Sequence, residues 1–137
     1  MASIRREVVI DVPATQAWAA LRDVGAVHTR LAKGFVTDCR LDGEGARIVT
    51  FANGLVAREL IVDVDDATRR VAWAAVGGRL THHNASAQVV EQGAGACRVV
   101  WQADLLPDAM APAIAAMIEQ GTAAMKRTLE AAGPGPA

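Results

Sequence analysis

The sequence predicts an α+β domain in which an antiparallel sheet packs against one long C-terminal helix. Three observations support this. Apolar and polar residues alternate in several short segments, as they do in half-buried strands. Turn-forming residues separate most of these segments at short intervals, which favours antiparallel neighbours over parallel crossovers. The last long segment instead has apolar residues at helical spacing.

The chain is expected to begin with one strand followed by two short helices. In residues 4–12, apolar side chains alternate with polar or charged ones, which predicts a half-buried strand. Pro13 ends this strand. Apolar residues then recur every three to four positions up to Gly25, which predicts a first helix. Residues 26–31 are expected to form a second short helix.

Six further strands are predicted after Gly34. The segments between them are "DGEG", "NG", "DDATR", "GG" and "GAGA", and all are rich in residues that tolerate turns. The strands are expected at residues 35–41, 47–52, 56–64, 71–76, 81–91 and 98–105.

A long helix is predicted from Pro107 and Asp108 to about Ala132, before the tail "GPGPA". Its apolar face is expected to hold Met110, Ile114, Met117, Ile118, Gly121, Met125 and Leu129. A glycine inside a helix costs about 1 kcal/mol relative to alanine. Gly121 is therefore expected to provide room, either for a close approach of helix and sheet or for a cavity.

Composition limits the function classes. The 137 residues carry a formal net charge of −1 without a basic run, so no nucleic-acid partner is expected. The N-terminal segment is charged, and no apolar stretch approaches the ~20 residues of a membrane span, so we expect a cytoplasmic protein with no membrane span. Cys39 and Cys97 lie in separate predicted strands and are expected to be buried free thiols.

This order of elements resembles the helix-grip fold of the START-like SRPBCC superfamily. That superfamily includes polyketide cyclases, lipid-transfer domains and plant hormone receptors. The resemblance implies a curved, seven-stranded antiparallel sheet that wraps around the C-terminal helix and leaves a cavity between them. It covers residues 1–132 as a single domain, with residues 133–137 as a flexible tail.

Two loops resemble those of abscisic-acid receptors more closely. "NGLVARE" at residues 53–59 is similar to their gate loop and the glutamate after it, and "GGRLTHHNAS" at residues 77–86 is similar to their latch loop. The resemblance implies ligand contacts at seven positions, which are Thr37, Leu55, Glu59, Trp73, Arg79, Leu80 and His83. Thr37 stands where the receptors have a lysine that pairs with the hormone's carboxylate, which implies a less acidic ligand here.

Strand geometry separates the two adjacent histidines. Successive side chains of a strand point to opposite faces. His83 is in phase with a row of small apolar residues and is expected to point inward, whereas His82 is in phase with a polar row and is expected to face solvent. Two ligands on opposite faces cannot chelate one ion, so no metal site is expected. We also find no cofactor-binding motif.

The direction of Glu59 is ambiguous, because the strand around it has two partly apolar faces. A bulge could reconcile the two faces, and the alternative is a glutamate on the surface of the sheet. If it points inward, lost hydration would raise its pKa and suit it to acid–base chemistry. Trp101 shares a face with apolar neighbours and is a further candidate for lining a cavity, as are Met117 and Gly121 of the long helix.

Two functions follow. The first is binding of a small hydrophobic molecule, lipid-like or polycyclic, between sheet and helix. The alternative is an enzyme of the polyketide cyclase/dehydratase type, in which His83 and Glu59 move protons as catalytic residues. The oligomeric state is open between a monomer and a homodimer.

Overall fold

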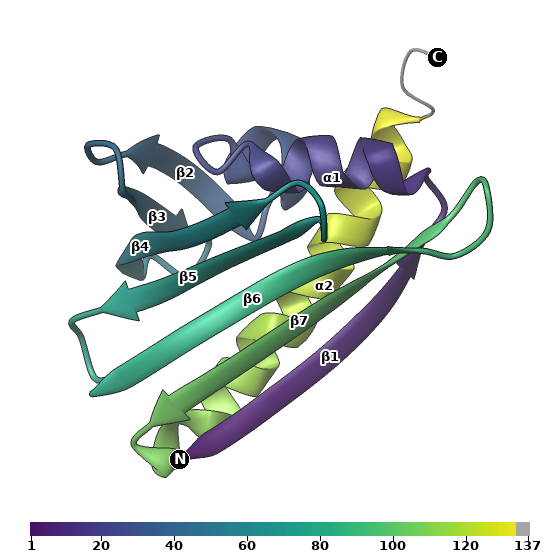
Figure 1. Cartoon of the computed structure of the whole chain (residues 1–137). Coiled ribbons are helices and arrows are strands. Elements are labelled where there is room, and N and C mark those ends of the chain that lie inside the picture. Colours follow the sequence, from purple (N-terminus) through teal and green to yellow (C-terminus); the bar gives the residue numbers. More distant parts are fainter. Residues whose placement is uncertain (134–137) are drawn as a thin grey trace.

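The computed structural model describes residues 1–133, and seven strands form one sheet with the order β1-β7-β6-β5-β4-β3-β2. All neighbouring strands are antiparallel. The strands are β1 (Ala2–Ile10), β2 (Val36–Leu41), β3 (Ala46–Phe51), β4 (Val56–Asp65), β5 (Arg70–Val76), β6 (His82–Glu91) and β7 (Cys97–Leu106). The strands curve around one long helix, as Figure 1 shows. The predicted fold class, a curved seven-stranded sheet with a C-terminal helix, is therefore confirmed.

The helices lie where the sequence predicts them. Two short ones follow β1, namely α1 (Ala14–Arg22) and a single π-helical turn, η1 (Val27–Leu31). The long helix α2 (Ala111–Ala132) is preceded by a short 3-10 turn, η2 (Asp108–Met110). Pro112 stands at the start of α2, where the missing N–H costs no intrahelical hydrogen bond.

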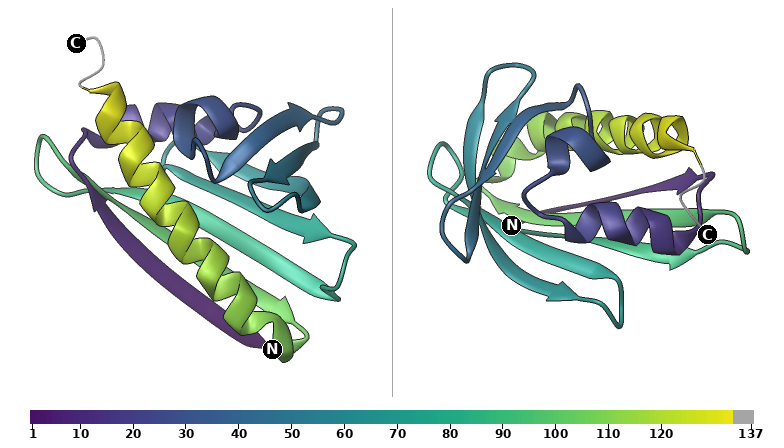
Figure 2. Two further views of the ribbon diagram at one scale, coloured as in Figure 1. Left: turned by 180° about the vertical axis from the view of Figure 1, so that it is seen from behind. Right: turned by 90° about the horizontal axis from the view of Figure 1, so that it is seen from above.

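The helices occupy one face of the sheet. The two views of Figure 2 show α2 running diagonally across that face along β1 and β7, with α1 and η1 near its C-terminal end. Ile118, Met125 and Leu129 of α2 are buried against the sheet. Ile114 and Met117 lie closer to the other end of the helix and are only partly buried.

The core follows from strand alternation. Ile10, Val99 and Leu105 point inward from β1 and β7 and are almost fully buried. Both cysteines are buried and free, as the sequence predicts. Among residues 1–133, no helix is long and apolar enough to cross a membrane. The predicted flexible tail covers residues 133–137, of which 134–137 lie outside the described residues.

Candidate functional site

The space between the sheet and α2 holds two small apolar cavities. The inner cavity, about 60 Å³ in volume, lies against α1 and η1 and reaches Leu31 and Met125. The outer cavity, about 100 Å³, lies toward the start of α2 and reaches Leu80 and Ile114. Five residues line both cavities and so form the wall between them, namely Phe35, Phe51, Glu59, Trp73 and Trp101.

Aromatic rings make up most of that wall. Trp73 and Trp101 meet edge to face, with ring centroids 5.8 Å apart and an interplanar angle of 63°. Phe35 and Phe51 form a second edge-to-face pair at 5.3 Å and 64°. Such pairs are favourable beyond the apolar area they bury. The four rings hold the two cavities apart.

A buried ion pair lies in the same wall. Arg47 of β3 and Glu59 of β4 are direct cross-strand neighbours, and Arg47 Nε donates to Glu59 Oε1 at 2.8 Å. Their side chains are only 8% and 11% exposed. Arg47 Nη1 also donates to the carbonyl oxygen of Val24 at 3.2 Å, and its guanidinium lies 5.4 Å from the ring centroid of Trp73. The site therefore carries charge inside an apolar interior.

Sequence reasoning missed Arg47, although a signal was present. Arg47 is in phase with Val49 and Phe51, which both line the cavities, so alternation along β3 already places it on the inner face. A charged side chain is almost never fully buried unless it is paired, and Glu59 stands directly opposite on the next strand.

Glu59 points inward, and a bulge explains how. The pairing of β4 with β5 shifts between Ile61 and Asp63, so that Val62 turns outward and is 64% exposed. Before the bulge Glu59 and Ile61 face the interior, and after it Val64 does. A bulge that reconciles the two partly apolar faces is therefore present in β4.

The two histidines point to opposite faces of β6, as predicted. His82 is exposed, and its Nε2 lies 2.7 Å from Asn84 Oδ1. His83 lines the outer cavity, and its Nδ1 accepts the backbone N–H of Ala75 at 2.9 Å. Burial lowers the pKa of His83 below its usual 6.5, and the neighbouring His82 lowers it further. Among residues 1–133, no three His, Cys, Asp or Glu side chains are grouped so that they could hold a metal ion.

Six other residues named as candidates lie at the cavities or directly behind them. Leu55, Leu80 and Met117 line the outer cavity, while Trp73 and Trp101 line both. Gly121 lies behind Trp101 and is not among the lining residues. A Cβ atom at this position would stand 2.6 Å from Trp101 Cζ3, so the glycine permits close contact between helix and ring.

Two candidates, Thr37 and Arg79, lie elsewhere, and neither lines the inner or the outer cavity. Thr37 stands at a register shift of β2 between Val36 and Asp38, where its side chain is exposed. Its Oγ1 hydroxyl donates a hydrogen bond to the carbonyl oxygen of Thr50 at 3.3 Å. The shift turns Val36 into the inner cavity in its place. Arg79 is exposed in the loop before β6 and lines neither cavity, because the loop carries its side chain into solvent.

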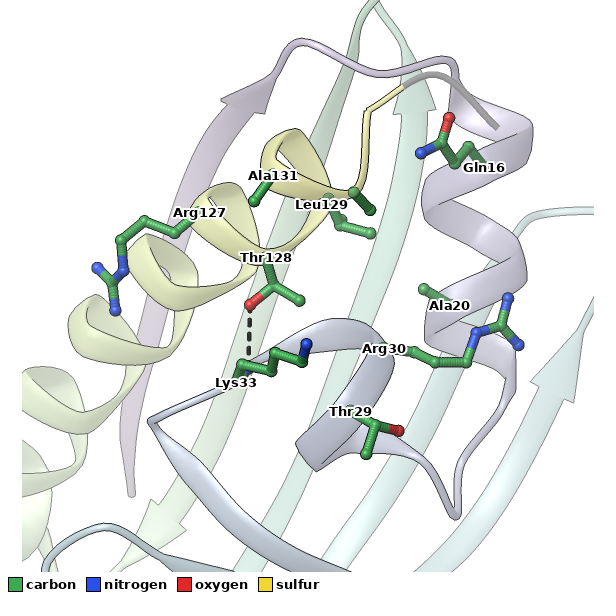
Figure 3. Close-up of a pocket in the computed structure, with 10 residues that line it drawn as sticks. Gln16, Ala20, Thr29, Arg30, Lys33, Arg127, Thr128, Leu129 and Ala131 are labelled. Carbon is green, nitrogen blue, oxygen red and sulfur yellow. Dashed lines mark hydrogen bonds between the residues drawn. The ribbon is translucent and has the colours of Figure 1, made fainter. Parts of the chain in front are cut away.

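A larger hollow of about 500 Å³ lies on the surface between α1, η1 and the end of α2. It was not predicted. Figure 3 shows that the guanidinium groups of Arg127 and Arg30 point to opposite sides, and Arg30 is paired with Asp23 at 2.9 Å. Lys33 is held there through its backbone N–H, which donates to Thr128 Oγ1 at 3.0 Å. The cationic groups do not converge, so the interior cavities are the stronger candidate site.

Comparison with known proteins places this architecture in a family. Residues 1–130 match the family model described as "Polyketide cyclase / dehydrase and lipid transport". The chain belongs to this family. A search of curated proteins finds no match.

Several solved structures have the same fold as this chain. The protein XoxI from Bacillus cereus is 16% identical with a TM-score of 0.83, and the match covers 95% of this chain and 96% of that one. A START superfamily protein from Mycobacterium smegmatis is 12% identical with a TM-score of 0.79, covering 95% and 98%. The di-domain ARO/CYC BexL of the BE-7585A biosynthetic pathway is 17% identical with a TM-score of 0.82, and 95% of this chain covers 47% of that one. At these identities the likeness establishes the helix-grip fold.

Proposed function

We propose that the protein binds a small, flat hydrophobic molecule in the interior between the sheet and α2. The observation that carries the proposal is the shared aromatic wall, in which Trp73 and Trp101 face both cavities. Aromatic rings supply large contact areas and favour edge or offset contacts with other rings. A lining of this kind suits a polycyclic ligand better than a long flexible chain.

Binding requires the wall to move. The cavities of about 60 and 100 Å³ are small beside the roughly 300–1,000 Å³ of typical ligand pockets. A ligand with two or three rings therefore fits only if aromatic side chains turn and join the cavities. The Trp101 ring is confined by Gly121 of α2 on one side and by Trp73 on the other. A ligand that joins the two cavities must therefore displace this ring.

The buried Arg47 gives this interior a polar end. Its guanidinium has five N–H donors, and its hydrogen bonds to Glu59 and Val24 use two of its nitrogens, Nε and Nη1. No acceptor within residues 1–133 bonds Nη2, so this group can donate to an oxygen of a ligand in the inner cavity, which Arg47 lines. We infer that the ligand carries at least one acceptor oxygen.

The experiment that tests binding uses fluorene as an apolar polycyclic probe and follows tryptophan fluorescence. Quenching is expected because Trp73 and Trp101 line the cavities. Ala57→Leu fills the outer cavity and is expected to weaken fluorene binding about tenfold or more. Ala123→Leu lies on the exposed face of α2 and serves as the control. Equal fluorene affinity in both variants would place binding elsewhere.

Native mass spectrometry of the purified protein complements this titration. We expect a co-purified small molecule, whose mass would narrow the ligand class. The same measurement on the Ala57→Leu variant is expected to show less of it.

A second candidate function is acid–base catalysis of the cyclase/dehydratase type, since His83 and Glu59 line the same outer cavity. Each is already hydrogen-bonded, Glu59 to Arg47 and His83 to Ala75. With a short poly-carbonyl chain as substrate, His83→Ala is expected to lower turnover about 10²–10⁴-fold while ligand affinity changes only a few-fold. Equal losses in turnover and affinity would favour simple binding.

The cytoplasmic location and the lack of a nucleic-acid partner stay predictions from the sequence. The choice between monomer and homodimer stays open, and size-exclusion chromatography with light scattering would decide it.

A further inference from the structure

We propose that His83 is a specificity-determining residue, which selects ligands that carry an acceptor oxygen, such as a carbonyl, over equally flat molecules without one. This inference rests on the proposed binding function. It concerns the outer cavity, which His83 lines together with Ala75 and Leu80.

The sheet opens at this point. Strands β5 and β6 pair from Arg70↔Gln88 to Trp73↔Ala85, and the ladder ends there. In continued register, Ala75 would stand opposite His83. The strands instead diverge, and the imidazole takes the place of the missing backbone partner, since Nδ1 accepts the Ala75 N–H at 2.9 Å. His83 therefore spans the gap between β5 and β6 with its side chain.

This hydrogen bond determines the tautomer. A backbone N–H only donates, so Nδ1 must present its lone pair and cannot carry a proton. A neutral imidazole has one N–H, which is then on Nε2. The neutral form is also favoured by burial, which lowers the pKa of His83. The ring therefore presents the Nε2–H group as a donor, while Ala75 occupies the lone pair of Nδ1.

The Nε2–H group is available to a ligand. Among residues 1–133, no protein atom accepts a hydrogen bond from it. Glu59, the carboxylate that lines the same cavity, is bonded to Arg47 through Oε1. A donor beside an apolar cavity gains a hydrogen bond only from a ligand that has an acceptor, and a ligand without one leaves it unpaired.

The chemistry of the preferred ligand follows. It combines a flat apolar body, which contacts Trp73 and Trp101, with a carbonyl, ether or phenolic oxygen placed at the His83 end. A neutral hydrogen bond in such a site corresponds to a preference of roughly 2- to 13-fold over the analogue that lacks the oxygen.

The test compares fluorene with fluorenone, which differ by one carbonyl, through quenching of tryptophan fluorescence. The unmodified protein is expected to bind fluorenone about tenfold more tightly. His83→Gln places an amide N–H near the position of Nε2 and should retain most of this preference. His83→Asn places an acceptor oxygen near the position of Nδ1 and so keeps the bond to Ala75, but its shorter side chain has no donor at the position of Nε2, and the preference should be lost. His83→Phe, verified as folded by circular dichroism, should lose it too.

The outcomes separate the two proposals. If neither probe binds, the proposed binding function is wrong and the role of His83 is wrong with it. If both probes bind the unmodified protein equally, the cavity binds ligands but His83 does not select them. If His83→Phe or His83→Asn retains the full preference for fluorenone, another donor makes the selection and the assignment to His83 is overturned.

Discussion

Gly121 is the position at which a single methyl group tests the packing between α2 and the site. A Cβ atom there would stand 2.6 Å from Trp101 Cζ3, 3.0 Å from Trp101 Cη2 and 3.1 Å from Phe35 Cε2. All three distances are below ordinary van der Waals contact. Trp101 must therefore retreat toward the cavities in the Gly121→Ala variant, and it meets Trp73 there.

Two opposing free-energy changes decide the stability of Gly121→Ala. Alanine is favoured over glycine inside a helix by about 1 kcal/mol. Overpacking of a filled interior costs about 1–3 kcal/mol. We therefore expect the free energy of unfolding to fall by about 0–2 kcal/mol, although the same change in an unconstrained helix would raise it.

A double-mutant cycle isolates the contact with Trp101. Trp101→Phe removes the outer ring atoms Cζ3 and Cη2 that a Cβ would meet. In that background, Gly121→Ala is expected to stabilise the protein by up to about 1 kcal/mol, which gives a coupling of about 1–3 kcal/mol between the two positions. Urea denaturation followed by circular dichroism measures each variant.

The exposed Ala123 supplies the control, because Ala123→Gly reports the helix-propensity difference in the same helix without contact to the site. Zero coupling between positions 121 and 101, with Gly121→Ala stabilising both backgrounds equally, would refute the reasoning that Gly121 makes room for Trp101.

Three further predictions concern the buried polar groups. Arg47→Met leaves Glu59 buried without its partner and is expected to lower the free energy of unfolding by about 3–5 kcal/mol in urea denaturation, whereas a loss below about 1 kcal/mol would contradict a buried pair. The pKa of His83 lies below 6.5 in the folded protein, so between the folded pKa and pH 6.5 the unfolded chain binds more protons than the folded one. The free energy of unfolding should therefore fall as the pH drops below 6.5 and level off below the folded pKa of His83. His83→Asn should abolish this part of the pH profile. Burial raises the pKa of the Cys39 and Cys97 thiols, so a chromogenic disulfide reagent should label them slowly in the native protein and rapidly in urea, and fast native labelling would count against their burial.

The sequence by itself determined the order and approximate bounds of the elements, because alternation and helical spacing are local signals. It also assigned His83 to the inner face and His82 to the outer one, since the period of a strand is two residues. It left the direction of Glu59 open, and the bulge that turns this side chain inward was one of the two possibilities.

Tertiary structure alone decided where the site's polar groups meet and how much space they leave. Thr37 is turned out of the interior by a register shift, which depends on how β2 pairs with β3. Arg47 gains its partner only because the register of β3 and β4 sets it opposite Glu59. The division of the interior by Trp73 and Trp101 depends on how closely α2 approaches the curved sheet. These are contacts between strands and helices far apart in the chain, and residue patterns along a single element do not specify the distance between elements.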